Sequence, residues 1–332
     1  MKTLVLTKFS KTPMQAMALT EGPLPRVAPA QVLVRMRAAA LNPADLHIES
    51  GEMKLMSPVK PPFALGVDGA GVVESDGRRF RKGDRVMVYT GLVHCGTLAE
   101  VMALPEDWLA TVPEGWSEAE AAAAPLALLV ATKVLDRTAA KPGERMLVTA
   151  AGGPVGAAVT ALTVARGLHV HGLGSGADEA YVRSLGAKDY TDYRTGTVRA
   201  FGRHFDIALD CLGGTAFNEA AAVIRPGGRI VSLKVMTGTE DMEAMGMRIP
   251  GLMKLLLPLV FRKQRKAAER AGARLIGLAS HQDGAALERA AELAARVGYR
   301  PRIDSLHPMA DFASAFARLA AHPRGKVVVS IA

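Results

Sequence analysis

Cysteine is scarce in this chain. Only Cys95 and Cys211 occur among 332 residues. Two distant cysteines form no disulfide framework, and they lack the spacing of a thiolate zinc site. We therefore expect neither a disulfide-stabilised secreted domain nor a structural zinc site.

Long apolar runs are also missing. No stretch reaches the roughly 18 residues that a membrane span requires, and the longest candidate, 249–261, is interrupted by Pro250, Lys254 and Pro258. Near the N-terminus, Leu4-Val5-Leu6 is too short for a signal peptide and is better interpreted as a first strand. These features predict a protein without a membrane span and with a cytoplasmic location.

Acidic residues are nearly absent from one segment, and this explains the net charge. Between Arg248 and Arg274, eight Lys or Arg residues stand against Glu269, so the segment carries +7 of the total +9. The rest is nearly balanced, so we expect no nucleic-acid partner. The segment is also rich in leucine and predicts one or two amphipathic helices. Three interpretations are open: a cap over a substrate cleft or a subunit contact, a solvated basic face, or contact with a membrane surface or nucleic acid.

The chain does contain a glycine-rich turn between a predicted strand, Met146–Thr149, and a predicted helix from Val155 to about Arg166. Small residues let the backbone approach a pyrophosphate, and the helix N-terminus offers free N–H groups. Pro154 removes one of these donors. The residues of the turn that we assign to cofactor binding are Ala150, Gly152, Gly153, Pro154, Val155 and Gly156.

The next strand indicates which dinucleotide binds. It covers His169–Leu173 and ends in Gly174-Ser175-Gly176. NAD-selective sites place an acidic residue about 20 residues after the turn, where it binds the ribose hydroxyls. Here the strand tip offers Ser175, and Asp178 comes later, where it suits the first turn of a helix. We therefore predict NADPH as cofactor, with Ser175 in its site.

Strand and helix patterns alternate after the turn, which predicts a doubly wound parallel sheet of α/β class. The predicted strands are Met146–Thr149, His169–Leu173, Asp189–Thr191, Phe205–Leu209 and Arg229–Leu233. The first 115 residues instead place short strands between Pro- and Gly-rich turns, which predicts a small β-barrel. These earlier strands are Gln31–Ala38, Ala70–Glu74 and Arg85–Val88. Residues 299–332 predict a strand, a helix and a strand.

Several ordered motifs carry a family resemblance. They are Asn42-Pro43-Ala44-Asp45, Gly66-Val67-Asp68-Gly69-Ala70-Gly71, Lys82-Gly83-Asp84-Arg85-Val86, Gly96-Thr97-Leu98-Ala99-Glu100, the dinucleotide turn and Gly325-Lys326-Val327-Val328. With them the chain resembles the medium-chain dehydrogenase/reductase superfamily, and most of all its zinc-free quinone oxidoreductase branch.

The resemblance implies two domains. Residues 1–116 and 284–332 would form a GroES-like β-barrel catalytic domain, and residues 117–283 a Rossmann NADPH-binding domain with a basic helical insertion at about 242–270. It also implies a homodimer formed by sheet extension, for which 275–278 is a suitable edge.

The same comparison argues against a catalytic metal. Zinc-dependent relatives have cysteine at the position of Asn42 and a His-Glu pair at Val67 and Asp68. An amide and an alkyl group cannot replace thiolate and imidazole ligands. His47 lies nearby but has no cysteine partner, so we interpret it as a packing or surface residue and predict no metal.

Without a metal, the accessible chemistry is hydride transfer from NADPH to a small electrophilic substrate, such as a quinone or an α,β-unsaturated carbonyl. Asn42 can donate a hydrogen bond through its amide, and the resemblance puts it in the cleft; the alternative is an Asn-Pro turn residue. Asp45 is expected to orient neighbours or back the cleft. We expect the proton to come from solvent or an enol oxygen.

The remaining cofactor residues follow from the resemblance. Tyr193 would lie near the adenosine phosphate, and the nicotinamide pocket would be lined by Asp210-Cys211-Leu212-Gly213 and by the strand end from Leu233 to Val235. Lys326, in the closing motif, is also assigned to the cofactor.

Two departures narrow the function. Enoyl-thioester reductases of this superfamily have a tyrosine acid just after the glycine that matches Gly51, where this chain has Glu52 and Met53. Val130 replaces a threonine near the nicotinamide, and Thr132 could compensate. Three hypotheses remain: a quinone or enone reductase, a pathway-specific enoyl or carbonyl reductase, and a non-catalytic NADPH-binding protein.

Overall fold

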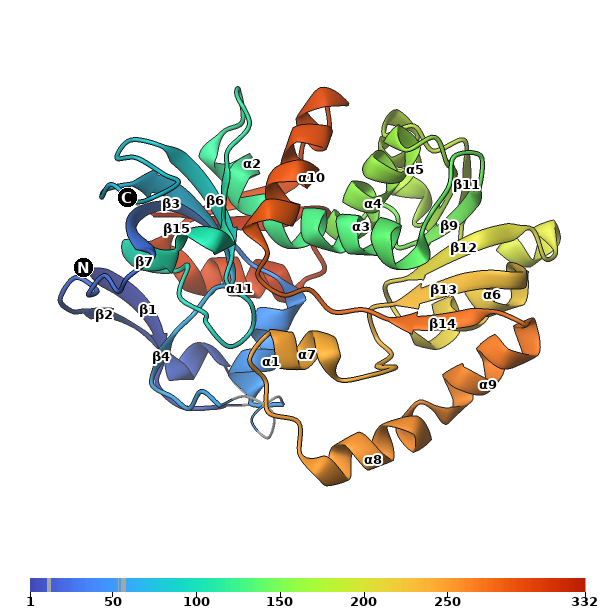
Figure 1. The fold of residues 1–332 in the computed structure, drawn as a ribbon, viewed down its shortest axis with the longest axis horizontal. Coiled ribbons are helices and arrows are strands. Elements are labelled where there is room, and N and C mark those ends of the chain that lie inside the picture. The colour runs from blue at the N-terminus through green and yellow to red at the C-terminus, as the bar shows by residue number, and fades with distance from the viewer. Residues whose placement is uncertain (11–12, 53, 55–57, 332) are drawn as a thin grey trace.

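The chain folds around two large sheets that lie side by side, with α3 (Pro125–Thr138) and α10 (Gly284–Arg296) between them (Figure 1). The computed structural model describes residues 1–10, 13–52, 54 and 58–331. The prediction that involved Met53 therefore lies outside the described residues.

One sheet is entirely parallel and has six strands in the order β11-β10-β9-β12-β13-β14. In chain order this is 3-2-1-4-5-6, the arrangement of dinucleotide-binding sheets. Its strands are β9 (Arg145–Thr149), β10 (His169–Gly174), β11 (Asp189–Asp192), β12 (Phe205–Asp210), β13 (Ile224–Ser232) and β14 (Arg274–Gly277). The helices that follow these strands are α4 (Pro154–Ala165), α5 (Glu179–Ser184) and α6 (Gly214–Val223). The predicted doubly wound sheet is thus confirmed.

One strand differs from its prediction. We expected a strand over Arg229–Leu233, but β13 begins at Ile224, which pairs with Phe205 before the register shifts to Ile207 opposite Arg229. Residues 225–228 loop out at this irregularity, and Gly227 has φ +77° there. A Pro-Gly-Gly sequence signals a turn, but it does not show that the strand already begins before this turn, at Ile224.

The second large sheet is built from both ends of the chain. Its order is β15-β16-β3-β5-β6-β8, with β7 also paired to β3, and a three-stranded sheet, β2-β1-β4, lies beside it. The strands are β1 (Lys2–Leu6), β2 (Met17–Glu21), β3 (Gln31–Ala40), β4 (Phe63–Ala64), β5 (Asp68–Val73), β6 (Arg85–Tyr89), β7 (Val101–Pro105), β8 (Leu109–Thr111), β15 (Ile303–Pro308) and β16 (Lys326–Ser330). Since β16 pairs antiparallel with β3, a late segment completes the N-terminal domain.

Helices join and cover these sheets. They include α1 (Pro43–Ser50), α2 (Glu118–Ala123) and α11 (Phe312–Ala320). Because α10 contacts β8 of one sheet and α3 and α4 beside the other, it belongs to the junction. The predicted boundaries at 116/117 and 283/284 stay predictions.

The basic segment forms helices between β13 and β14, namely α7 (Glu240–Ala244), α8 (Gly251–Val260) and α9 (Arg262–Ala271). Figure 1 shows α8 and α9 following one another along the outer edge of the molecule. Ala268 and Ala271 of α9 are buried in a small core shared with α6, whereas in α8 only Leu257 is buried.

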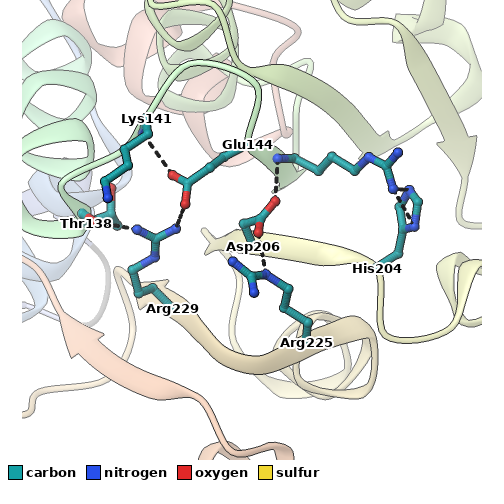
Figure 2. A network of polar contacts seen from close by, with 8 residues as sticks. Thr138, Lys141, Glu144, His204, Asp206, Arg225 and Arg229 are labelled. Atoms are coloured by element: carbon teal, nitrogen blue, oxygen red, sulfur yellow. Dashed lines mark hydrogen bonds and ion pairs between the residues drawn. The ribbon is translucent and has the colours of Figure 1, made fainter.

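Ion pairs hold the parallel sheet at the amino ends of its strands (Figure 2). Arg229 pairs with Glu144 and donates to the Thr138 carbonyl, while Asp206 pairs with Arg225 and accepts from the Arg145 N–H. Ligands of such sheets bind at the carboxyl ends. This network is therefore structural and leaves the opposite edge for the site.

Candidate active site

A cavity of about 790 Å³ lies at the carboxyl ends of the parallel strands. Its lining includes the predicted residues Ala150, Gly152, Gly153, Ser175 and Tyr193. Residues 322–324, from the loop that precedes β16, also line it. The cavity is therefore bordered by both domains, at the place where a doubly wound sheet binds a dinucleotide.

The glycine-rich turn has the geometry that its sequence predicts. Gly153 caps α4 in an extended conformation, and Pro154 is the first helical residue. At this position the missing N–H of proline costs no helical hydrogen bond. A Cβ on Gly156 would lie 2.3 Å from the Ala150 carbonyl oxygen. Glycine is thus required at 156 for the helix to follow the turn so closely.

The strand tip of β10 offers a hydroxyl where NAD-binding sites offer a carboxylate. Ser175 Oγ is buried and finds no hydrogen-bond partner in the described part of the chain. Tyr193 is 60 % exposed, and the Arg194 guanidinium lies 5.6 Å from its ring centre. A hydroxyl without a partner, an exposed phenol and a cation fit a ribose 2′-phosphate.

Asp178 is an acidic residue beside the turn, and it lines the large cavity. It lies so close to Gly152 that a Cβ there would be 2.4 Å from its own Cβ. Arg302 Nη1 donates to Asp178 Oδ1 at 3.0 Å. Asp178 lines the same cavity as Ser175, and this ion pair balances its carboxylate.

At the other end of the cavity, one aspartate organises the ends of β12 and β13. Asp210 is fully buried; its Oδ1 accepts from the N–H groups of Leu212 and Gly213, and its Oδ2 accepts from Ser232 Oγ at 2.7 Å. The Cys211 N–H donates to Thr149 Oγ1 at 3.0 Å. Burial, as the main cause, raises the pKa of the Cys211 thiol to about 12, so it is not a nucleophile at neutral pH.

A second cavity of about 300 Å³ includes Leu233 and Val235 in its lining. It continues to Phe261, between α8 and α9, and to Met242 and Met245 of the α7 region. The lining is mainly apolar, so it suits the apolar part of a substrate.

A buried polar cluster joins three predicted or matched positions. Lys326 Nζ donates to Asn42 Oδ1 at 2.5 Å and to Asp68 Oδ2 at 2.7 Å, and Asn42 Nδ2 donates to Asp68 Oδ2 at 3.0 Å. The Leu126 N–H donates to Asp68 Oδ1 at 3.0 Å. Asn42, Asp68 and Lys326 are each at most 3 % exposed. The cluster therefore ties α1, β5, β16 and the start of α3 together.

This cluster bears on the roles that we predicted for Asn42 and Lys326. The Asn42 amide is turned toward Asp68 and Lys326, and the Asn42 N–H donates to Asp45 Oδ2 at 2.7 Å. As placed, neither side chain presents a free polar atom to the cofactor cavity. A contact of Asn42 with a ligand would have to replace one of these bonds.

Two carboxyl groups, Asp45 and Glu49, lie one turn apart on α1 in a fully buried position. Burial, as the largest cause, raises the pKa of Asp45 to about 7 and that of Glu49 to about 9; each also feels a neighbouring negative charge. Asp45 Oδ1 and both Glu49 oxygens find no hydrogen-bond partner among the described residues. Glu49 therefore holds its proton at neutral pH.

The described residues contain no group of three or more His, Cys, Asp or Glu side chains that could hold a metal ion. Asp68 already faces the Lys326 ammonium. His47, the lone candidate, pairs with the exposed Glu52 at 2.7 Å. The described donor set does not fit a catalytic zinc ion.

The predicted cofactor residues fall into five places. Ala150, Gly152, Gly153, Ser175 and Tyr193 line the large cavity, while Pro154, Val155 and Gly156 begin α4. Cys211 adjoins the lining residue Leu212, Leu233 and Val235 line the second cavity, and Lys326 lies in the buried cluster. Val130 is buried within α3.

Sequence reasoning did not find residues 322–324 or Thr215 and Ala216, which also line the large cavity. The only local signal was the position of Thr215 and Ala216 at the start of a helix after a strand. Residues 322–324 carry no motif, and only the packing of the two domains brings them to the cavity.

Family comparisons match both halves of this architecture. Residues 28–114 match the family described as alcohol dehydrogenase GroES-like domain, and residues 185–329 match the family described as zinc-binding dehydrogenase. The words "zinc-binding" describe that family, whereas the described residues of this chain contain no cluster of His, Cys, Asp or Glu that could hold a metal ion.

Known proteins resemble the chain over most of its length. The quinone oxidoreductase of Thermus thermophilus, solved also in complex with NADPH, is 30 % identical, superposes with a TM-score of 0.76 and is covered completely, as is this chain. The "NADPH-dependent alkenal/one oxidoreductase, chloroplastic" of Arabidopsis thaliana is 34 % identical over 226 residues, which are 63 % of this chain and 56 % of that protein.

A third relative is much longer than this chain. The "Pikromycin polyketide synthase component PikAII" of Streptomyces venezuelae is 33 % identical over 262 residues, which are 74 % of this chain and 7 % of that protein. The chain thus spans about half of the second relative and a small part of the third.

Proposed function

Because this chain belongs to the medium-chain dehydrogenase/reductase superfamily, in its quinone oxidoreductase-like branch, we propose that it is an NADPH-dependent reductase. In this proposal it transfers a hydride to a quinone or an α,β-unsaturated carbonyl, without a metal and in the cytoplasm. The observation that carries the cofactor assignment is Ser175, whose buried hydroxyl has no partner among the described residues and lines the large cavity.

In this proposal the cofactor extends from the large cavity to the second one. The glycine-rich turn and the N-terminus of α4 would receive the pyrophosphate, because free N–H groups and the helix dipole favour anions there. Ser175, Tyr193 and Arg194 would hold the 2′-phosphate. Leu233 and Val235 would enclose the nicotinamide ring. The solved relative complexed with NADPH supports the same choice.

NADPH supplies the hydride in this reaction. The protein's part is to hold the acceptor against the nicotinamide ring in the second cavity. Reduction of a conjugated carbonyl places negative charge on its oxygen. The Asn42 amide would stabilise this charge by exchanging its hydrogen bond to Asp68 for one to the substrate. Asp45 would orient Asn42 through the backbone contact at 2.7 Å. The proton that completes reduction comes from solvent in this proposal.

Metal independence is supported by the Lys326 ammonium beside Asp68. A zinc ion near these residues would meet a fixed positive charge instead of thiolate or imidazole ligands. Chelator treatment should leave turnover unchanged, and a chelator-sensitive rate would contradict this part of the proposal.

A pathway-specific reductase is the second candidate, and the second cavity favours it. Its lining by Met242, Met245 and Phe261 comes from the segment between β13 and β14. Flexible methionine side chains adapt to irregular apolar ligands. A substrate screen should therefore include quinones, enones, alkenals and enoyl thioesters.

The first test of the cofactor assignment is titration with NADPH and NADH. A Ser175→Asp variant should lower NADPH affinity at least tenfold, about 1.4 kcal/mol, because the new carboxylate repels a 2′-phosphate. The exposed Ser184→Asp variant is the matched control. Equal loss in both variants, or NADH preference in the unaltered protein, would contradict the assignment. Tight NADPH binding without turnover of any acceptor would instead favour a non-catalytic binding protein.

A further inference from the structure

Helix α8 carries an apolar stripe that faces outward. Its large side chains at Leu252, Leu255, Leu256, Leu259 and Val260 are between 41 % and 74 % exposed. Their spacing of i, i+3, i+4, i+7 and i+8 puts them on one helical face. Such a stripe normally packs against the protein core. Here the buried side of α8 is provided by Leu257, so the stripe is left without a partner in the described part of this chain.

Helix α9 adds a basic face directly after this stripe. Five of its Lys and Arg side chains are exposed and form no ion pair with the described residues: Arg262, Lys263, Arg265, Lys266 and Arg270. The opposite side of α9 is fixed, because Ala268 and Ala271 are buried in the core. Its cations therefore point to solvent. Lys254 of α8 is different, since it pairs with Glu243.

The α9 cations and the apolar stripe of α8 together indicate which kind of partner binds this face. A nucleic acid would neutralise the cations but would leave five large apolar side chains in water. A second copy, docked symmetrically through this face, would bury the cations of both copies, with Glu269 as the one acidic residue of α8 and α9 to pair with them. A bilayer with anionic headgroups satisfies both features, because phosphates face cations while apolar side chains enter the acyl boundary.

We propose that α8 and α9 form a docking surface for anionic membranes, on which the leucine face of α8 inserts at the headgroup level and the α9 cations contact lipid phosphates. The α8 stripe and these five α9 side chains are the lipid-docking surface. Ten residues of helix extend about 15 Å, and no helix in the described ranges is long and apolar enough to cross a membrane. The protein would thus lie on the bilayer.

The test is flotation of the full-length protein with vesicles. Vesicles of phosphatidylcholine with about one-third phosphatidylglycerol should bind the protein, whereas pure phosphatidylcholine should bind it at least tenfold less. Binding to the anionic vesicles should weaken in about 0.5 M salt, because screening at that ionic strength shortens electrostatic attraction.

Two variants separate the two parts of the surface. Leu255→Ser/Leu259→Ser removes exposed apolar groups, and Arg262→Ser/Lys266→Ser removes charge; each should reduce vesicle binding at least tenfold without loss of folding. Matched controls elsewhere are Leu24→Ser/Leu306→Ser, which are 58 % and 59 % exposed, and the exposed pair Arg166→Ser/Arg296→Ser. These controls should bind vesicles like the unaltered protein.

Four results would overturn the proposal. One is no binding to anionic vesicles at any protein concentration that stays soluble. Another is equal binding by the variants of the lipid-docking surface and by their controls. A third is a fall in oligomeric state in Leu255→Ser/Leu259→Ser while vesicle binding persists, since a second copy would then cover the stripe. Titration with a duplex oligonucleotide completes the set: affinity for DNA above that for the vesicles would also contradict a lipid partner.

Discussion

At the scale of the residue, the Lys326 side chain is expected to contribute strongly to the stability of the folded protein. Its ammonium is the only cation bonded to the buried Asp68 among the contacts of the described residues. A buried carboxylate that loses its counter-charge typically costs about 3–5 kcal/mol. The Lys326→Met variant should therefore unfold at a lower urea concentration, with a loss in that range.

Two companions make this prediction specific. The double variant Lys326→Met/Asp68→Asn should recover part of the loss, because it removes the unpaired charge as well. The exposed Lys82→Met variant should behave like the unaltered protein. A Lys326→Met protein as stable as the original would mean that the cluster does not hold the two chain ends together.

Glu49 makes stability depend on pH. Its pKa is raised to about 9, mainly by burial and further by Asp45, from an ordinary value of 4.5. Between these values the unfolded chain has released the proton while the folded chain keeps it. Stability therefore falls as pH rises through this window, by up to about 1.4 kcal/mol per pH unit from this group.

A Glu49→Gln variant carries no such proton and should lose this part of the slope. Its melting temperature should be close to that of the original protein at pH 5 and higher at pH 9. Asp45, whose pKa burial raises to about 7, keeps its own contribution in both proteins. The exposed Glu114→Gln variant is the control. Parallel melting curves for Glu49→Gln and the original across this range would disprove the assignment.

At the scale of the element, the β9-turn-α4 unit depends on close packing at Gly156. A methyl group there would meet the Ala150 carbonyl oxygen at 2.3 Å, so the turn and the helix must separate. The Gly156→Ala variant should lose at least tenfold in NADPH affinity, about 1.4 kcal/mol, measured by calorimetric titration. Gly22→Ala, where the added carbon meets nothing within 4 Å, should bind NADPH normally. Equal affinity in the two variants would refute the packing argument.

Elements with local signals could be predicted from the sequence. The turn, the helix after it and five strands of the parallel sheet follow from glycine spacing and from alternating apolar runs, and the structure confirms them within a few residues. The early start of β13 could not be predicted, because its pairing with Phe205 depends on a neighbouring strand. The same holds for the contact between Lys326 and Asp68, which are 258 residues apart.

Some residues of the candidate site could likewise be predicted from local sequence signals, and others could not. Residues of the turn and of the β10 tip were predicted because a dinucleotide requires their local chemistry. Residues 322–324 reach the cavity only through the packing of both domains. In the same way, no motif predicted that the Asn42 amide would bond to Asp68 and Lys326.

At the scale of the whole molecule, β14 and β11 are the two edge strands of the parallel sheet, since they end the strand order. The resemblance that predicts a homodimer places the contact at the β14 edge. Light scattering of the purified protein should then give about twice the 35.0 kDa of one chain. A Leu275→Pro variant should shift the mass toward one chain, because proline cannot donate to a strand partner. A monomer in the unaltered protein would contradict the predicted dimer.

Strand β16 carries a consequence for synthesis of the protein. Asp68 leaves the ribosome long before Lys326, yet the two must meet in the finished domain. While translation proceeds, the nascent β3 and β5 lack both their neighbour β16 and the ammonium that balances Asp68. The parallel sheet requires none of the residues after 277 for its strands. Hence the nucleotide-binding domain can fold first. A ribosome stalled shortly before residue 326 would hold a chain that can form this domain but cannot complete the other.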